Sequence, residues 1–230
     1  MTDPAVAGEP LSEEADRSEG EMRADGRLVI WRGLDAWRTE SSQVFLGPNG
    51  IEAHGTQVGV DPVPYRLDYR LDASDGFVTR RLALTAAGTG WSRRLDLRHD
   101  GAGAWTIDAV AVGTVKLPEP GGDPASLGQA RDCDLGFSPL TNLMPIRRSG
   151  LNTQPGSADF VMAWVAVPDL TVVASAQRYE HIRRTATGSV VRYVDLGLFP
   201  GFEADLELDE SGIALRYPEL AELVSSNTDA

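Results

Sequence analysis

The sequence has very few of the residues that build redox and metal centres. Its 230 residues include one cysteine, Cys133, and three histidines, His54, His99 and His181. A single cysteine excludes an internal disulfide and fits a reducing compartment, so we expect a cytoplasmic protein. No two histidines are paired at the i, i+4 spacing of a helical metal site, and we predict no metal site. Because two aspartates flank Cys133 and disfavour its thiolate, we interpret it as a small buried apolar residue.

Sequence motifs for cofactor binding and nucleophilic catalysis are also missing. Lys116 is the only lysine, and no G-x-x-x-x-G-K loop precedes it. Gly101-Ala102-Gly103 lacks the later glycine and the strand-to-helix setting of a dinucleotide fingerprint, so it is a turn. No serine lies in a G-x-S-x-G elbow. We therefore predict no cofactor and no catalytic residue.

Long hydrophobic runs and a surplus of basic residues are absent as well. No window approaches the roughly 18 apolar residues that span a bilayer, and the N-terminus lacks a signal-peptide pattern, so we expect neither membrane insertion nor export. The formal net charge of -13 disfavours nucleic acid and anionic membranes as partners. Eight acids less two arginines leave about six of these charges in residues 1–26. That segment has only two large apolar residues, so we predict a disordered acidic tail.

The sequence is rich in apolar and polar residues that alternate with a period of two. Residues 65–72 read YRLDYRLD, which predicts a half-buried strand, and the turn signal Ser74-Asp75-Gly76 joins it to a second strand at 77–85. Further strands are predicted at 28–33, 36–45, 51–59, 91–98, 105–108, 110–116, 159–167, 170–184, 189–196, 202–208 and 213–217. About a dozen strands with frequent turns predict an all-β fold, a large antiparallel barrel, roll or sandwich.

Helical periodicity is limited to two short segments. Residues 141–149 and 218–225 carry apolar residues at helical spacing, and the second begins with proline. The loop at 118–128 separates two halves without a change in composition. We therefore predict a single domain over residues 27–225, followed by a short disordered tail at 226–230.

In one segment of the sequence, many polar residues are interspersed with apolar ones. Residues 132–148 read DCDLGFSPLTNLMPIRR. Buried polar atoms need partners, so these residues either line a ligand cavity or form a hydrogen-bonded brace. Asp132 and Asp134 could hold a divalent ion because alternate strand residues share a face, but the surrounding residues favour a hydrogen-bonded corner. If Glu40, Glu52 or Asp134 faces inward, burial raises its pKa unless an arginine neutralises it.

The aromatic residues suggest an interior cavity. Five tryptophans and five tyrosines are spread along the predicted strands, and many must belong to the core. A roll of a dozen strands has an interior too wide for side chains to fill, so we expect a ligand cavity. Arginines and tyrosines at its rim would suit an amphiphile with an acidic or sugar head and an apolar tail.

The motif D-x-D-L-G-F-S-P-L-T-N-x-x-P-I-R-R at 132–148 also carries a family resemblance. Further matching positions are Trp91 with Arg93-Arg94-Leu95, Gln177-x-Tyr179, Arg192-Tyr193, and Asp209 to Tyr217-Pro218. With these motifs the chain resembles the bacterial putative glycolipid-binding family from about Trp31 to Val224. The resemblance implies a spiral β-roll, similar in architecture to bacterial lipid and lipoprotein carriers, and it brings no settled catalytic residues. Ser149 and Glu219 depart from the family pattern, where leucine and glycine are more typical.

Together these observations predict a protein that binds an apolar or amphiphilic small molecule, such as a lipid or glycolipid, inside the roll without catalysis. A structural or interaction protein with a filled core is an alternative. A small enzyme that uses carboxylate and arginine groups in the cavity is another. The sequence does not fix the oligomeric state. The predicted ligand-binding residues are Arg80, Arg94, Asp134, Asn142, Arg147, Tyr179 and Tyr193.

Within the motif, specific structural roles are expected as well. Asp134 is expected to form a charged pair with Arg147 or Arg148. Thr141 and Asn142 are candidates for capping the turn into the short helix. The apolar residues of the segment, Leu143, Met144 and Ile146, are expected to plug one end of the roll.

Overall fold

One continuous sheet dominates the fold in the computed structural model, which describes residues 26–226. Its fourteen strands lie in the order β7-β6-β5-β4-β3-β2-β1-β14-β13-β12-β11-β10-β9-β8. The strands are β1 (Arg27–Gly33), β2 (Arg38–Leu46), β3 (Ile51–Gly59), β4 (Tyr65–Ser74), β5 (Val78–Gly88), β6 (Trp91–His99), β7 (Trp105–Gly113), β8 (Asp132–Leu135), β9 (Ser157–Val165), β10 (Val172–Thr185), β11 (Gly188–Asp195), β12 (Glu203–Asp209), β13 (Ala214–Tyr217) and β14 (Ala221–Ser226). The predicted all-β class is confirmed. Its pairing is antiparallel except between β8 and β9, which run parallel.

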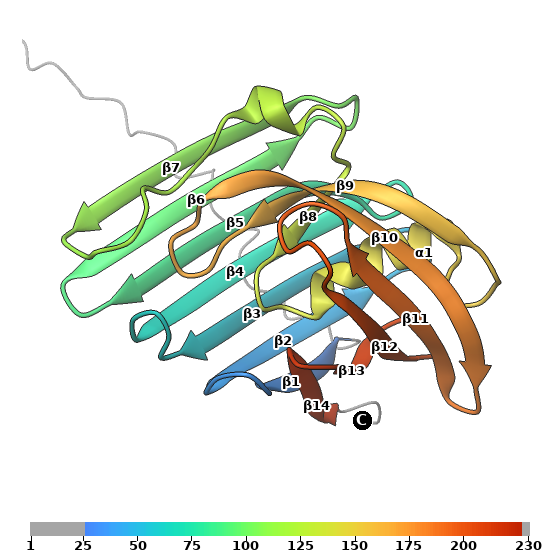
Figure 1. The fold of residues 1–230 in the computed structure, drawn as a ribbon. Helices are drawn as coiled ribbons and strands as arrows, with labels where there is room; N and C mark the ends of the chain where they lie inside the picture. The colour runs from blue at the N-terminus through green and yellow to red at the C-terminus, as the bar shows by residue number, and fades with distance from the viewer. Residues whose placement is uncertain (1–25, 227–230) are drawn as a thin grey trace, which may run out of the picture.

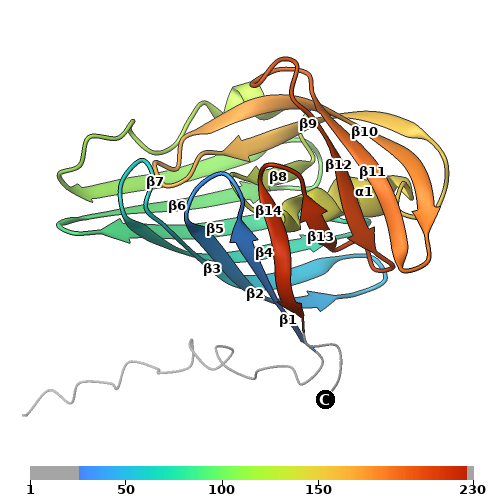
Figure 2. The same cartoon turned by 60° about the horizontal axis from the view of Figure 1, so that its bottom comes forward.

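The sheet curls so that its two halves face each other. Strands β1–β7 form one layer, and β9–β12 arch over it (Figures 1 and 2). Pairing of β1 with β14 joins the first half to the second. Between the halves lie β8 and a short helical segment, 3-10 helix η2 (Leu140–Asn142) followed by α1 (Leu143–Ser149). A second 3-10 helix, η1 (Pro124–Leu127), lies in the loop after β7.

The period-two pattern explains which face of each strand lies inside. In β4, Tyr65, Leu67, Tyr69, Leu71 and Ala73 are buried, and the residues between them lie on the outer face. Removing such apolar side chains from water contributes roughly 25 cal/mol per Å² of buried surface. The alternation in the sequence therefore fixes the side of each strand that faces the interior.

The centre of the roll is filled by the chain itself. Leu143, Met144 and Ile146, which were predicted to plug one end of the roll, are almost fully buried between the two halves of the sheet. Helix α1 ends at Gly150, which has a left-handed φ of 71° and donates its N–H to the carbonyl of Arg147. The interior of the roll is therefore not a wide open space, because α1, η2 and β8 occupy it.

The observed elements differ from the predicted ones at three places. The helix predicted at 218–225 is wrong, because Ala221–Ser226 forms strand β14 instead. Strand β14 fills the place between β1 and β13, where backbone groups of both neighbours need partners, and this pairing overrides a weak helical pattern. Predicted strands 105–108 and 110–116 form one strand, β7. Strand β8 was not predicted, since it has only four residues and all of them are buried.

The predicted terminal tails fall almost entirely outside the described residues. Only Gly26 and Ser226 are described, and Ser226 is the last residue of β14. In the part of the chain from 26 to 226, no helix has both the length and the apolar character needed to cross a bilayer.

Candidate functional site

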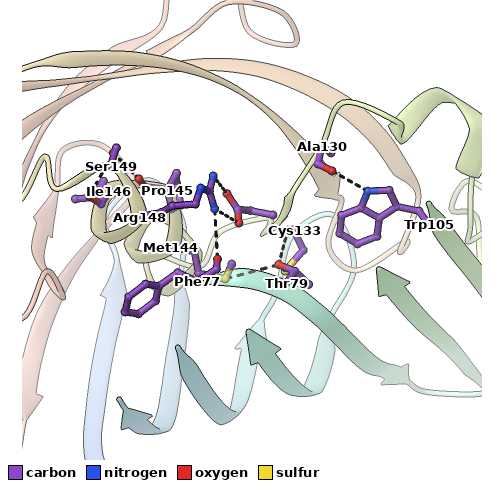
Figure 3. Close-up of polar contacts among 11 residues, drawn as sticks. Phe77, Thr79, Trp105, Ala130, Cys133, Met144, Pro145, Ile146, Arg148 and Ser149 are labelled. Atoms are coloured by element: carbon purple, nitrogen blue, oxygen red, sulfur yellow. Dashed lines mark hydrogen bonds and ion pairs between the residues drawn. The ribbon is translucent and has the colours of Figure 1, made fainter. Parts of the chain in front are cut away.

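A buried ion pair holds the motif at the centre of the roll. The guanidinium of Arg148 donates to both carboxylate oxygens of Asp132, at 2.5 Å each, and to the carbonyl oxygen of Phe77 at 3.4 Å (Figure 3). Arg147 instead donates to the carbonyl oxygen of Ser211 at 3.2 Å. The expected pairing of Asp134 with one of these arginines is therefore wrong, and Asp132 is the partner of Arg148.

Cys133 lies beside this pair, inside the core. Its N–H donates to the hydroxyl of Thr79 at 2.9 Å, and that hydroxyl also lies near the sulfur atoms of Cys133 and Met144 (Figure 3). Burial raises the pKa of the Cys133 thiol to about 12. The interpretation of Cys133 as a buried apolar residue is confirmed, because such a thiol is neither accessible nor ionised.

Asp134 is held by neutral donors. The hydroxyl of Thr141 donates to one carboxylate oxygen at 2.9 Å, and the amide of Gln177 donates to the other at 2.7 Å. Thr141 also accepts the N–H of Leu135, whereas Asn142 accepts the hydroxyl of Tyr179 at 2.8 Å. Burial raises the pKa of Asp134.

The capping role expected for Thr141 and Asn142 is not observed. Asn142 precedes the first residue of α1 but makes no side-chain capping bond to the helix. Thr141 uses its hydroxyl on the backbone and carboxylate of β8. Both side chains thus join the helical segment to neighbouring strands rather than satisfying the helix N-terminus.

A second buried carboxylate lies behind the turn that follows β8. Glu40, on β2, accepts hydrogen bonds from the hydroxyls of Tyr69 at 2.5 Å and Ser138 at 2.8 Å, and from the amide of Gln57 at 3.3 Å. The same amide donates to the carbonyl oxygen of Gly136 at 3.3 Å. Desolvation outweighs these bonds and raises the pKa of Glu40 to about 7.

A cavity of about 260 Å³ opens next to these networks, between the end of β8 and strands β9, β11 and β13. Its polar residues are Asp134, Ser138 and Asn142. Six aromatic residues line the remainder, together with Leu135, Gly136 and Leu220; they are Phe137, Trp164, Tyr193, Phe199, Phe202 and Tyr217. Phe199 is 53% exposed, so the cavity reaches the surface beside it.

The six aromatic residues that line the cavity, here called the aromatic wall, include two groups of rings in mutual contact. Trp164 and Phe199 meet edge to face with their centroids 5.9 Å apart. Tyr193 contacts Phe202 at 6.0 Å and Tyr217 at 5.9 Å. The hydroxyl of Tyr193 donates to Asp195 at 3.1 Å. The arrangement combines a broad apolar and π-rich surface with one buried carboxylate, and it can hold a small molecule that has both an apolar and a polar part.

Comparison with known proteins is consistent with this architecture. A family model described as "Putative glycolipid-binding" matches residues 28–222. The chain belongs to this family. A crystal structure of a DUF1089 family protein from Pseudomonas aeruginosa is similar with a TM-score of 0.62 and 25% identity, covering 84% of this chain and 94% of that chain. A β-barrel-like protein of domain family DUF1849 from Brucella abortus aligns with a TM-score of 0.48 and 9% identity, over 88% and 97% of the two chains. No curated protein matches.

The central motif of this family member contributes directly to the cavity. Of the predicted ligand-binding residues, Asp134, Asn142 and Tyr193 line it. Tyr179 is fully buried behind Asn142, to which it donates its hydroxyl. The ligand-binding roles of these residues stay predictions.

The three predicted arginines lie elsewhere. Arg80 pairs with Asp75 and donates to Ser74. Arg94 lies in a shallow hollow on the outer face of the sheet, and Arg147 lines a separate hollow near the end of α1. An acidic ligand head at the cavity therefore has no arginine from this set to bind.

Sequence reasoning missed most of the aromatic wall. Phe137, Trp164, Phe199, Phe202 and Tyr217 come from four separate segments, so no spacing in the sequence unites them. Of the three carboxylates considered for an inward-facing position, Glu40 and Asp134 are buried, whereas Glu52 is exposed. Within residues 26–226, no three histidine, cysteine, aspartate or glutamate side chains gather as metal ligands do.

Proposed function

We propose that this protein binds a small amphiphilic molecule, of the lipid or glycolipid type, in the aromatic-walled cavity beside Asp134. The observation that carries the proposal is the cavity itself, with six aromatic side chains and a polar end. The family description supports the same class of ligand. Since α1 and η2 fill the centre of the roll, the ligand occupies this side cavity and not a wide barrel interior.

The size of the cavity limits how much of a ligand it encloses. Its volume of about 260 Å³ is below the roughly 300–1,000 Å³ of cavities that enclose drug-sized molecules. A head group or a short chain fits inside, but a complete two-chain lipid does not. The remainder of a longer ligand would leave past the exposed ring of Phe199.

Filling the cavity tests the proposal. We expect Leu220→Trp to abolish ligand binding, because the larger side chain occupies space that Leu220 borders. Val112→Trp is the matched control, since Val112 is 62% exposed on β7 and does not line the cavity. Native mass spectrometry of protein taken directly from cells, and thermal stabilisation of delipidated protein by lipid extract, report binding.

Wild type and Val112→Trp should retain bound mass and gain a higher melting temperature, whereas Leu220→Trp should do neither. The proposal fails if wild type binds no component of a lipid extract. It also fails if Leu220→Trp, folded by circular dichroism, binds as wild type does.

An enzyme acting on such a molecule is the second candidate. It is favoured by the buried carboxylate of Asp134, which accepts hydrogen bonds from the neutral side chains of Thr141 and Gln177. A carboxylate with a raised pKa can act as a general acid or base. Incubation of wild type and Asp134→Asn with a lipid extract, followed by mass spectrometry of the products, distinguishes the two functions. Products formed by wild type and absent with a folded Asp134→Asn variant would establish the enzyme.

A further inference from the structure

The cavity places a buried carboxylate where no protein cation neutralises it. Asp134 is 9% exposed and borders the cavity, and its two oxygens accept one bond each from Thr141 and Gln177. A carboxylate offers about four acceptor sites, so two remain. A buried charge is costly unless an opposite charge accompanies it. Of the arginines in and beside this segment, Arg131 is exposed and Arg148 is engaged with Asp132.

More negative charge surrounds the same cavity. Asp195 lies behind Tyr193 and accepts its hydroxyl, and Asp195 is one of the charges that raise the pKa of Asp134. Glu40, whose pKa burial raises to about 7, lies behind Ser138 and adds a negative charge only above that pH. Among the described residues that line the cavity there is no arginine, lysine or histidine. Arg38 lies 4.2 Å from the ring centre of Phe137, but its guanidinium is bound by Asp35 and the carbonyl oxygen of Leu220.

The aromatic wall adds a second preference for a cation. The faces of tryptophan, tyrosine and phenylalanine rings carry partial negative charge and attract ammonium groups within about 6 Å of the ring centre. Tyr193, Phe202 and Tyr217 contact one another and border the cavity together with Asp134. Burial, and after it the nearby charge of Asp134, raises the pKa of Tyr217.

We propose that this cavity binds the ammonium group of its ligand, with Asp134 as counter-ion and the rings of Tyr193, Phe202 and Tyr217 as a cation–π surface. The proposal rests on the proposed binding function and specifies the charge of the ligand. It favours an amine or a quaternary ammonium compound over a neutral sugar head, and it excludes a phosphate, sulfate or carboxylate head. Desolvation makes the charged contact count more here than on the surface.

Three probes with the same six-carbon chain test the charge preference by isothermal titration calorimetry. They are hexyltrimethylammonium, hexyl glucoside and hexyl sulfate. We expect the ammonium probe to bind at least about 10-fold more tightly than the glucoside, and the sulfate not to bind measurably. Because the chain has a net charge of -13, the titrations are run at physiological ionic strength, where nonspecific attraction is screened.

Substitutions test whether the preference for an ammonium group comes from the cavity. Asp134→Asn should weaken the ammonium probe by about 10-fold or more and the glucoside by less than about 3-fold. Asp108→Asn makes the same change on the exposed face of β7 and should alter neither. Phe202→Leu retains an apolar side chain but removes a ring, so it should weaken the ammonium probe by a factor of about 2 to 30 and spare the glucoside. This second variant keeps the test valid if Asp134→Asn does not fold.

The outcomes separate this inference from the binding function on which it rests. Tighter binding of the glucoside or the sulfate, abolished by Leu220→Trp, would overturn the ammonium preference and leave the binding function intact. Equal loss of ammonium binding in Asp134→Asn and Asp108→Asn would also overturn it, because general charge would then explain the effect. Absence of binding by all three probes and by a lipid extract would overturn both.

Discussion

Replacing Arg148 with alanine should lower the free energy of unfolding by about 3–5 kcal/mol, one of the largest effects that a single substitution outside the apolar core can have here. The guanidinium donates to both oxygens of Asp132, whose side chain is 1% exposed. Without Arg148 the carboxylate stays buried and loses the positive charge that pairs with it. Urea denaturation followed by tryptophan fluorescence measures the change.

Arg147→Ala is the matched control for this prediction. Arg147 neighbours Arg148 on α1 but donates to one carbonyl oxygen, that of Ser211, so its loss should cost about 1 kcal/mol. Adding Asp132→Asn to Arg148→Ala should recover part of the lost stability, because the buried charge is then removed. If the two arginine substitutions lower the free energy of unfolding equally, the bidentate pair of Arg148 and Asp132 contributes no more to stability than the single hydrogen bond of Arg147.

The strands could be predicted from the sequence wherever one face is buried and the other is solvated. Residues 65–72 alternate strictly, and they form most of β4. In contrast, Asp132–Leu135 is only four residues long and is buried on both faces inside the roll, so its acidic residues do not mark a solvated face. Residues 218–225 show helical spacing, yet β1 and β13 supply backbone partners that make a strand the better solution for Ala221–Ser226. Both departures come from tertiary context, which a local pattern does not contain.

The candidate site was predictable only in part. The segment 132–148 was recognisable because polar groups and apolar residues are interleaved there, and Asp134 and Asn142 do border the cavity. The ion pair within this segment could not be predicted, because the sequence offers two aspartates and two arginines. Only their placement on β8 and α1 selects Asp132 and Arg148 as partners. The polar residues of this segment thus mainly form a hydrogen-bonded network that joins β8 and α1 to the surrounding strands. The cavity lies where this network borders aromatic rings from distant strands.

Glu40→Gln should make the protein more stable at alkaline pH and have a much smaller benefit in acid. Burial raises the pKa of Glu40 from 4.5 to about 7 in the folded chain, so folding favours the protonated carboxyl group. As pH rises from about 4.5 to 7, the unfolded chain loses this proton first and stability falls; above pH 7 the loss is complete. The difference between the pKa values of Glu40 in the folded and unfolded chain corresponds to about 3 kcal/mol of unfolding free energy. The neutral amide of glutamine carries no such cost.

The pH dependence separates this charge effect from changes in the hydrogen bonds of Tyr69, Ser138 and Gln57, which affect the variant at every pH. Between pH 5 and pH 8, the stability of Glu40→Gln relative to wild type should rise by about 2–3 kcal/mol, measured by urea denaturation at each pH. Glu207→Gln, at an exposed position on β12, should show no comparable rise. If the Glu40→Gln difference stays constant with pH, Glu40 is ionised across the whole range. Its hydrogen bonds would then outweigh its desolvation, and the turn at Gly136–Ser138 would be anchored by a full negative charge.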